Sequence, residues 1–430
     1  MRIAFTTLGC KVNQYETETL SEMFSNDGFE VVDPQDFADV YVVNSCTVTA
    51  SGDKKTRQLL RRLKKQNPAA VAALTGCFPQ AFPDAAAKIL EADVVTGSSN
   101  RAALLPAVKE ALATGNRVVE ILPHQRGEKF EHMAVTGLRG RTRAFVKIED
   151  GCERYCSYCI IPKARGPVRS KPLEEIRAEL TELARNGYRE TVLVGINLSS
   201  YGKDLGLRLT DAVQAACQVD GIERVRLGSL EPELLTAGDI RSMAAERKFC
   251  PQFHLSLQSG CDKTLREMNR HYDTAEYARI VSDIRTVFEN PSITTDVMVG
   301  FAGETELDFV ESLAFVQKIG FAKAHVFSYS RRPGTAADKR PGQVSSAVKE
   351  SRSRRMIEAA DASRKDFLLS QLGRVEEVLV ETTRSPLGYE GFTKNYTPVY
   401  VDCDPAFCGQ IVKVRLEAVL EGHCIGAFRR

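Results

Sequence analysis

Three cysteines stand close together in the segment GCERYCSYC. Cys152, Cys156 and Cys159 follow a C-x3-C-x2-C arrangement. Three thiolates on one short loop can hold three irons of a cubane iron–sulfur cluster and leave the fourth iron open to a substrate or cofactor. The alternatives are a zinc site that lacks its fourth ligand and a chance grouping. The cluster is favoured, because the loop follows a predicted strand and Tyr158 precedes the last cysteine.

Three further cysteines stand at the ends of predicted strands near the N-terminus. The segments RIAFTTL, DVYVVNSC and AAVAALTGC read as strands, and Cys10, Cys46 and Cys77 stand where they end. Helical segments alternate with these strands, which predicts a parallel sheet with right-handed crossovers. Because the carboxyl ends of parallel strands lie along one edge of a sheet, we expect the three cysteines to converge.

The elements that position these cysteines belong to an ordinary globular chain. It has 430 residues, of which 43% are hydrophobic and 27% charged, so disordered and fibrous classes are excluded. Its 58 Lys and Arg residues nearly balance 56 Asp and Glu residues, so nucleic-acid contacts must depend on local patches. The first residues lack the features of a signal peptide and no apolar run could span a bilayer, which predicts a cytoplasmic protein without membrane partners. In that compartment, twelve cysteines indicate metal ligation or catalysis rather than disulfides.

Repeated β/α units predict the architecture of the middle of the chain. From Arg143 onward, six segments read as strands, and polar residues cluster after each of them. The segments are AFVKIED, ETVLVGIN, RVRLGSLEP, FHLSLQSG, ITTDVMVGF and AHVFSYS. This pattern is typical of a complete or partial (β/α) barrel, which carries its chemistry at the carboxyl ends of the strands. From Gln371 the tail alternates apolar and polar residues, which predicts a small antiparallel, OB-like β domain.

The segments around both groups of cysteines resemble the radical S-adenosylmethionine methylthiotransferase family. The N-terminal part of the resemblance is carried by LGCKVNQYE, VVNSCTV and LTGCFPQ. The central part is carried by GCERYCSYCIIPKARGPVRSK, GINLSSYG, LGSLEPE, FHLSLQSGCDKTLREMNRHY and TTDVMVGFAGET. Since these segments follow in family order along nearly the whole chain, we expect four ranges. They are a methylthiotransferase N-terminal domain at 1–115, a linker at 116–137, a radical S-adenosylmethionine core at 138–369 and a TRAM domain at 370–430.

The resemblance also implies cofactors. Family members carry two [4Fe-4S] clusters, and S-adenosylmethionine binds at the open iron of one of them. The ligands of that cluster would be Cys152, Cys156 and Cys159, and those of the auxiliary cluster would be Cys10, Cys46 and Cys77. An electron donor such as a flavodoxin or ferredoxin is a further implied partner. The positions matching the family's cofactor-binding segments are Tyr158, Gly195, Asn197, Glu231, Gln258 and Gly300. For the last five, an ordinary strand-end polar residue or turn glycine is the alternative.

The resemblance further points to a substrate. LGCKVNQYE together with NSC is similar to the subgroup that acts on N6-threonylcarbamoyladenosine beside the anticodon of tRNA. The implied reaction replaces hydrogen at C2 of that base with a methylthio group. Methylthiolation of isopentenyladenosine in tRNA, or of a ribosomal-protein side chain, is the alternative. A non-catalytic RNA-binding iron–sulfur protein is a third hypothesis.

Two concentrations of basic residues flank the cysteine loops. Residues 51–65 include seven Lys or Arg residues against one acid, and residues 139–171 include nine against three. Such runs are usually solvated faces of helices. Beside cluster-bearing loops, they favour a track for the phosphates of a tRNA anticodon arm. The residues expected to contact RNA are Lys54, Lys55, Arg57, Arg61 and Arg62.

Overall fold

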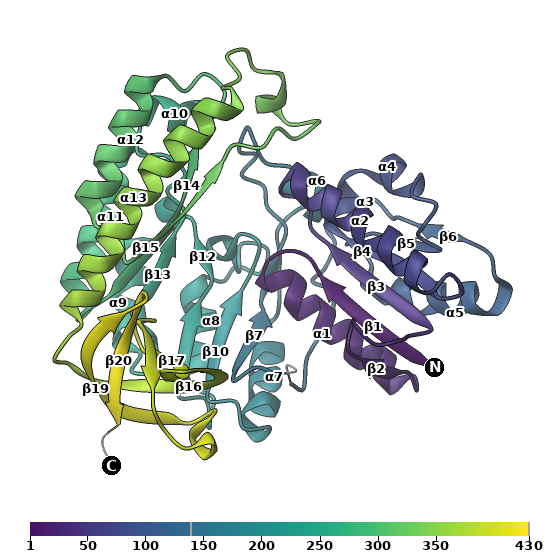
Figure 1. Cartoon of the computed structure of the whole chain (residues 1–430), viewed down its shortest axis with the longest axis horizontal. Helices are drawn as coiled ribbons and strands as arrows, with labels where there is room; N and C mark the ends of the chain where they lie inside the picture. Colours follow the sequence, from purple (N-terminus) through teal and green to yellow (C-terminus); the bar gives the residue numbers. More distant parts are fainter. Residues whose placement is uncertain (138–139, 429–430) are drawn as a thin grey trace.

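The computed structural model describes residues 1–137 and 140–428. They form an α/β unit at the N-terminus, an open barrel of parallel strands in the middle and a small β barrel at the C-terminus (Figure 1). The mixed α/β class predicted from the sequence is confirmed. Residue 138, the predicted start of the central domain, and Arg139 of the second basic run lie outside the described residues. Among the helices of the described ranges, none has both the length and the apolar character needed to cross a bilayer.

The N-terminal unit is built on one parallel sheet. Its strands are β1 (Arg2–Thr7), β2 (Glu30–Val32), β3 (Val40–Ser45), β4 (Val71–Gly76), β5 (Val94–Thr96) and β6 (Val118–Glu120). Its helices are α1 (Lys11–Asn26), α2 (Ala50–Gln66), α3 (Cys77–Ala81), α4 (Pro83–Ala87) and α5 (Leu104–Thr114). The strands lie in the order β2-β1-β3-β4-β5-β6. Helices α1 and α5 bury one face of the sheet, and α2, α3 and α4 bury the other.

Three strands of this sheet, β1, β3 and β4, match the segments predicted from the sequence. The other three strands have three residues each, too few for alternation of apolar and polar residues to stand out. Strand β6 lies within residues 116–137, which the sequence suggested as a linker, and it pairs in parallel with β5. That range therefore contributes the edge strand of the sheet before the chain crosses to the central barrel.

The central barrel repeats a strand followed by a helix. Its strands are β7 (Arg143–Lys147), β8 (Glu149–Asp150), β9 (Arg169–Ser170), β10 (Glu190–Val194), β11 (Arg224–Leu227), β12 (Ser229–Leu230), β13 (Gln252–Leu255), β14 (Ser292–Val299) and β15 (Lys323–Ser328). Its helices are α6 (Ile161–Arg165), α7 (Leu173–Arg185), α8 (Leu209–Cys217), α9 (Ala237–Ala245), α10 (Asp262–Glu267), α11 (Thr274–Val287), α12 (Glu306–Ile319) and α13 (Ser346–Ser370). These elements contain all six strands predicted for this part of the chain.

The barrel is open on one side. Strands β7, β10 and β11 form one parallel sheet and β12 to β15 form another. A bridge between Val225 and Phe249 joins the two sheets. Within the described residues, β7 and β15 do not pair, so the barrel is partial, as the sequence allowed. Figure 1 shows the N-terminal unit beside β7, opposite β14 and β15.

The C-terminal barrel closes with five strands. They are β16 (Val375–Ser385), β17 (Gly388–Thr393), β18 (Pro398–Val401), β19 (Ile411–Leu420) and β20 (His423–Phe428). The sequence predicted an antiparallel domain, but β18 and β20 pair in parallel. The reason is topological, because a closed ring with an odd number of strands cannot alternate direction at every step.

This small barrel seals the amino-terminal end of the central barrel. Arg224 and Arg226 point inward from β11 and donate to backbone carbonyls of the small barrel. Arg224 donates to Glu377 O at 2.7 Å, and Arg226 donates to Lys394 O at 3.1 Å. Ser292 at the start of β14 donates to Asn395 O at 2.5 Å. The open barrel is therefore closed at its floor and accessible only from the side and from the carboxyl end.

A group of buried charges joins the N-terminal unit to the central barrel. Glu16 of α1 pairs with Arg101 at 2.6 Å, with Lys147 at 2.8 Å and with Arg165 at 2.5 Å. Asp150 pairs with Lys147 at 2.6 Å and with both arginines at 3.4–3.5 Å. Burial by itself would raise the pKa of Glu16, but its three cationic partners lower it to about 2. These side chains come from four distant segments, so the network fixes the two units against each other.

The second basic run proves to be largely internal. Arg169 pairs with Glu128 at 3.1 Å, and Lys171 contacts Glu179. The expectation that residues 139–171 form a phosphate track is wrong for the four buried members of the run, because each is paired with buried or partly buried acids. These four are Lys147, Arg165, Arg169 and Lys171.

We expect Glu16→Gln to lower the free energy of unfolding by about 3–5 kcal/mol at pH 7, because three buried cations lose their carboxylate. Urea unfolding followed by circular dichroism measures this change. The exposed Glu110 on α5 provides the matched control, and Glu110→Gln should change the same free energy by less than about 0.5 kcal/mol.

The same pair of variants tests the pH dependence. The pKa of Glu16 is lowered from 4.5 to about 2 on folding, so its stabilisation is complete above about pH 4.5 and is lost as the pH falls towards 2. Wild type and Glu110→Gln should therefore lose more stability than Glu16→Gln between pH 5 and pH 3. Equal stability of wild type and Glu16→Gln at pH 7 would contradict the role of the network.

Candidate active site

The loop of Cys152, Cys156 and Cys159 lies between β8 and α6, at the carboxyl edge of the barrel strands. Gly151 precedes it with φ +91°, and a Cβ there would stand 1.9 Å from Pro167 O, so only glycine fits. Cys159 N donates to Cys156 O at 2.9 Å, which closes a turn between two of the cysteines. The fold therefore confines all three thiols to one compact loop.

Distant segments hold this loop in place. Ser157 N donates to Met268 O at 2.9 Å, and Ser157 Oγ donates to Glu267 O at 2.8 Å. Ala337 N in turn donates to Ser157 O at 2.7 Å. Tyr158, one of the predicted cofactor contacts, packs edge-on against Phe301 with ring centres 6.4 Å apart. The loop is thus positioned by the segments after α10 and after β15 rather than by its own sequence.

The thiols of this loop suit a cluster better than a single ion. Burial raises the pKa of Cys152 and of Cys159 to about 12, and the neighbouring thiols add to the rise. In residues 1–137 and 140–428, no three His, Cys, Asp or Glu side chains lie close enough to hold one metal ion. Ligands of a cubane cluster bind different irons and stand farther apart than ligands of one ion, so the zinc alternative fits less well. Iron binding would have to displace the thiol protons.

The predicted cofactor-binding residues gather along one edge of the barrel. Gly195 and Asn197 follow β10, Glu231 follows β12, Gln258 follows β13 and Gly300 follows β14. Because these strands are parallel, their carboxyl ends lie on the side that also carries the cysteine loop. The structure therefore brings together residues that span more than a hundred positions of sequence.

Three buried oxygens at this edge have no partner within the described residues. They are Asn197 Oδ1, Gln258 Oε1 and Glu149 Oε1. Buried polar atoms are nearly always satisfied, so the two amide oxygens, which can only accept, indicate a ligand that carries donors. The ammonium and hydroxyl groups of S-adenosylmethionine are donors of this kind. The site therefore fits that cofactor.

Glu149 explains one of the predicted glycines and was missed by the sequence reasoning. Glu149 Oε2 accepts from Asn197 N at 2.7 Å, and a Cβ on Gly195 would stand 2.6 Å from the same oxygen. Burial raises the pKa of Glu149 well above its ordinary value. Its position two residues before a glycine–cysteine pair was visible in the sequence, but no signal there distinguished it from other acids.

Arg270 is a second residue that the sequence reasoning missed. Its guanidinium donates to Cys156 Sγ at 3.4 Å and to Glu231 Oε1 at 3.3 Å, and it is almost fully buried. A buried cation beside the cysteines would offset the negative charge of thiolates that hold iron. Glu231, predicted to contact the cofactor, is thus held by an arginine that also contacts a cluster cysteine.

The second group of cysteines meets at the carboxyl edge of the N-terminal sheet. Cys10 precedes α1, Cys46 follows β3 and Cys77 begins α3, which starts where β4 ends. A Cβ on Gly9 would stand 3.1 Å from Cys46 Cβ, so the loops of Cys10 and Cys46 touch. The convergence expected from the three strand ends is therefore seen.

Two polar side chains link these cysteines to one another. Asn13 Oδ1 accepts from Cys10 Sγ at 3.3 Å and from the guanidinium of Arg165 at 3.1 Å. Arg165 Nε donates to Cys77 Sγ at 3.1 Å. Burial raises the pKa of Cys77 to about 12, and Arg165 opposes that rise. Three thiols, one of which accepts from a buried guanidinium, form a ligand set that fits a second iron–sulfur cluster.

Helix α6 connects the two groups of cysteines. It begins two residues after Cys159 and ends at Arg165, whose side chain reaches Cys77. Ile160 and Ala164 pack against Cys77 and Ala81 of α3. The distance between the two candidate clusters is therefore set by one short helix whose far end belongs to the buried charge network.

The predicted RNA contacts lie on α2, directly after the Cys46 loop. Leu60 and Leu63 pack into the sheet, and Thr49 caps the helix by accepting from Gly52 N at 3.2 Å. Not all of the basic residues are free. Arg57 is half-buried over Phe78, and Arg61 pairs with Glu91 at 2.9 Å. The predicted contacts left exposed without an ion pair in the described residues are Lys54, Lys55 and Arg62.

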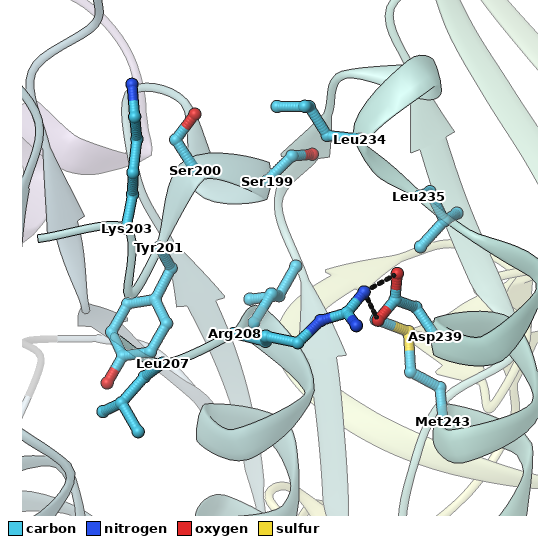
Figure 2. Close-up of a pocket in the computed structure, with 11 residues that line it drawn as sticks. Ser199, Ser200, Tyr201, Lys203, Leu207, Arg208, Leu234, Leu235, Asp239 and Met243 are labelled. Carbon is cyan, nitrogen blue, oxygen red and sulfur yellow. Dashed lines mark hydrogen bonds and ion pairs between the residues drawn. The ribbon is translucent and has the colours of Figure 1, made fainter. Parts of the chain in front are cut away.

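A separate pocket of about 200 Å³ lies on the flank of the barrel (Figure 2). Figure 2 shows Arg208 paired with Asp239 across it, at 2.7 Å. Ser199, at its rim, accepts from Glu231 N at 2.8 Å, so the pocket adjoins the carboxyl edge from outside. None of the predicted site residues lines it. The structure therefore does not place the predicted chemistry there.

Family models match two parts of the chain. Residues 2–97 match the family described as Uncharacterized protein family UPF0004, and residues 146–316 match the Radical SAM superfamily. Among solved structures, the fold is similar to a radical S-adenosylmethionine methyltransferase, TsrM, from Kitasatospora setae, with a TM-score of 0.57 and 13% identity. The match covers 78% of this chain and 74% of that one. At this identity the likeness shows the fold alone.

Curated relatives match nearly the full length. A threonylcarbamoyladenosine tRNA methylthiotransferase MtaB of Aquifex aeolicus is 37% identical over 88% of this chain and 93% of its own. The Bacillus subtilis protein of the same name is 35% identical over 96% and 93%. A tRNA-2-methylthio-N(6)-dimethylallyladenosine synthase of Pelotomaculum thermopropionicum is 32% identical over 97% and 95%. Because relatives more than 30% identical match most of this chain, it belongs to the radical S-adenosylmethionine methylthiotransferase family.

Proposed function

We propose that this chain replaces the hydrogen at C2 of N6-threonylcarbamoyladenosine, beside the anticodon of tRNA, with a methylthio group. The observation that carries the proposal is the pair of cysteine triads joined through α6, in a chain whose full-length relatives bear tRNA methylthiotransferase names. Each triad offers three thiols, which suits one cluster for radical generation and one for sulfur transfer.

The chain's own residues would bind and orient these groups. Cys152, Cys156 and Cys159 would hold the cluster that takes S-adenosylmethionine, and the unpartnered oxygens of Asn197 and Gln258 would accept hydrogen bonds from that cofactor. When bound, the cofactor supplies a carbon radical that can remove hydrogen from C2. The auxiliary ligands would be Cys10, Cys46 and Cys77. A flavodoxin or ferredoxin is the proposed class of electron donor.

Access to C2 requires that the base leave the stack. C2 lies inside a stacked helix, and enzymes that act on a base extrude it into a pocket. A single-stranded anticodon loop makes this extrusion inexpensive in free energy. The open side of the barrel faces the N-terminal unit, so an extruded base can enter between the two groups of cysteines while α2 contacts the phosphates.

The relatives also support an alternative substrate. Relatives named for threonylcarbamoyladenosine match at 34% to 37% identity, and relatives named for dimethylallyladenosine match at 32% to 34%. Turnover assays with anticodon stem-loops that differ only in this substituent distinguish the two substrates. Methylthio product from the threonylcarbamoyl RNA, and none from the dimethylallyl RNA, is the expected result. The reverse preference would refute the proposed substrate.

The two cysteine groups should separate by role. Replacing Cys10, Cys46 and Cys77 by Ala should halve the iron content and abolish methylthio transfer, while reductive cleavage of S-adenosylmethionine remains measurable. Replacing Cys152, Cys156 and Cys159 should also halve the iron but abolish both reactions. As a control, buried Cys217 is outside both groups, and Cys217→Ala should keep the iron and both reactions. Methylthio product from the first variant would overturn the assigned role of the auxiliary cluster.

Helix α2 should contribute to RNA affinity through its free cations. Lys54→Glu, Lys55→Glu and Arg62→Glu together should weaken binding of an anticodon stem-loop. They should also reduce the slope of log K against log salt by about 0.7–0.9 for each phosphate that the helix no longer neutralises. Filter binding at several salt concentrations measures both effects.

A matched reversal on the outer helices controls for net charge. Arg241, Lys318 and Lys365 are exposed on α9, α12 and α13. Changing these three to Glu should leave the salt slope within error of wild type. If both triple variants lower affinity and slope equally, α2 has no specific place on the RNA track.

A further inference from the structure

The interior of the open barrel is a hollow that solvent reaches. On β14 and β15, the side chains that point outward, such as Ile293, Val297 and Val326, pack against the surrounding helices. The alternate side chains must therefore point inward, and on β15 these are exposed. Across the strands they fall into register, with Asp296 paired to His325. Strands β14 and β15 lie across from the N-terminal unit, on the side where the barrel is not closed (Figure 1).

The hollow is polar near the amino-terminal ends of its strands and apolar at Met298 and Phe327, nearer their carboxyl ends. His254 Nε2 on β13 lies 3.2 Å from Asp296 Oδ2, and His254 Nδ1 forms a hydrogen bond with Thr294 Oγ1 at 3.0 Å. Ser229, His254, Thr294 and Lys323 form one row across β12 to β15. A space lined by this row suits a polar ligand, because an apolar group would leave these side chains without water or a partner.

Lys11 projects into this hollow from the N-terminal unit. It is the first residue of α1, directly after Cys10, and its ammonium lies 5.9 Å from the ring centre of Phe145 on β7. It is exposed to solvent, and the guanidinium of Arg141 lies over the same ring, 5.1 Å from its centre. Lys11 therefore stands beside β7, at the side where the barrel is open.

Lys11 has no acidic partner in the described part of the chain, whereas the arginines near it do. Arg226 pairs with Glu190 at 3.1 Å, and Arg143 pairs with Glu381 at 2.9 Å, so both arginines have acidic partners. Within residues 1–137 and 140–428, no carboxylate forms an ion pair with Lys11. The charge of Lys11 is therefore not offset by an acid of the described residues, and an anionic group that reaches it would be attracted.

We propose that Lys11 binds the carboxylate of the threonylcarbamoyl group when the modified base occupies the hollow. This inference rests on the proposed function. It identifies the chemical feature by which the chain tells its substrate from a base with an apolar substituent. Lys11 adjoins the auxiliary ligand Cys10, so the contact would also hold the base beside the group that donates sulfur.

Three anticodon stem-loops that differ at one base test the inference. One carries threonylcarbamoyladenosine, one carries the same group with its carboxyl converted to a neutral carboxamide, and one carries adenosine. Binding is measured anaerobically on the reconstituted enzyme without reductant, so no turnover occurs. Wild type should bind the carboxylate RNA on the order of tenfold more tightly than the carboxamide RNA, the effect of one charge-assisted hydrogen bond.

Substitutions of Lys11 show whether this residue causes the preference for the carboxylate RNA. Lys11→Met should bind the two RNAs equally, at about the affinity of wild type for the carboxamide RNA, and Lys11→Arg should keep the preference. Lys109, exposed on α5 and paired with Asp27 at 3.0 Å, supplies the control, and Lys109→Met should behave as wild type. Retained preference in Lys11→Met overturns the inference. So does equal weakening of all three RNAs, which would indicate a phosphate contact.

A measurement on unaltered protein guards against loss of the auxiliary cluster in the variants. Carboxylate RNA should protect Lys11 from reductive methylation, read by mass spectrometry of its peptide, more strongly than carboxamide RNA does. Equal protection by both overturns the inference. Turnover of the carboxylate RNA by wild type tests the proposed function separately. Product without a carboxylate preference in binding refutes only the role of Lys11, whereas absence of product refutes the proposed substrate.

Discussion

The buried pairing of Arg165 with Glu16 is the interaction on which the rest of the site depends. Arg165 ends the short helix that begins after Cys159, and its guanidinium contacts both the carboxylate of Glu16 and the thiol of Cys77. A buried charge is tolerated only with its partners in place, so the N-terminal unit cannot shift on the barrel without a large cost in free energy. One network therefore fixes the separation of two cysteine groups that lie on different domains.

The remaining architecture follows from that fixed separation. The barrel strands bring the cysteine loop, Arg270 and the unpartnered acceptors to one edge, while the N-terminal sheet brings three more cysteines to its own edge. The small C-terminal barrel seals the floor by accepting hydrogen bonds from Arg224 and Arg226. What stays open is the side between the two units, where Lys11 and His325 face the hollow.

The sequence could predict features with strong local signals. Strong apolar patterns predicted the main parallel strands. The spacing of Cys152, Cys156 and Cys159 predicted one group of cysteines, and the ends of the N-terminal strands predicted that the other three converge. It could not reveal that Lys147 pairs with Glu16, because those residues are 131 positions apart and a count of charges does not show which ones face solvent. The three-residue strands of the N-terminal sheet carried no detectable alternation. Glu149 and Arg270 become visible only when tertiary contacts show what they touch.

Nucleoside mass spectrometry of tRNA gives the most direct test of the central claim. Total tRNA would be compared between cells that carry this gene, cells that lack it and cells in which it is restored. The account predicts that 2-methylthio-N6-threonylcarbamoyladenosine disappears without the gene, that N6-threonylcarbamoyladenosine accumulates in its place, and that restoration reverses both changes. Unchanged 2-methylthio-N6-threonylcarbamoyladenosine, or loss of the methylthio group from the dimethylallyl nucleoside instead, would contradict it.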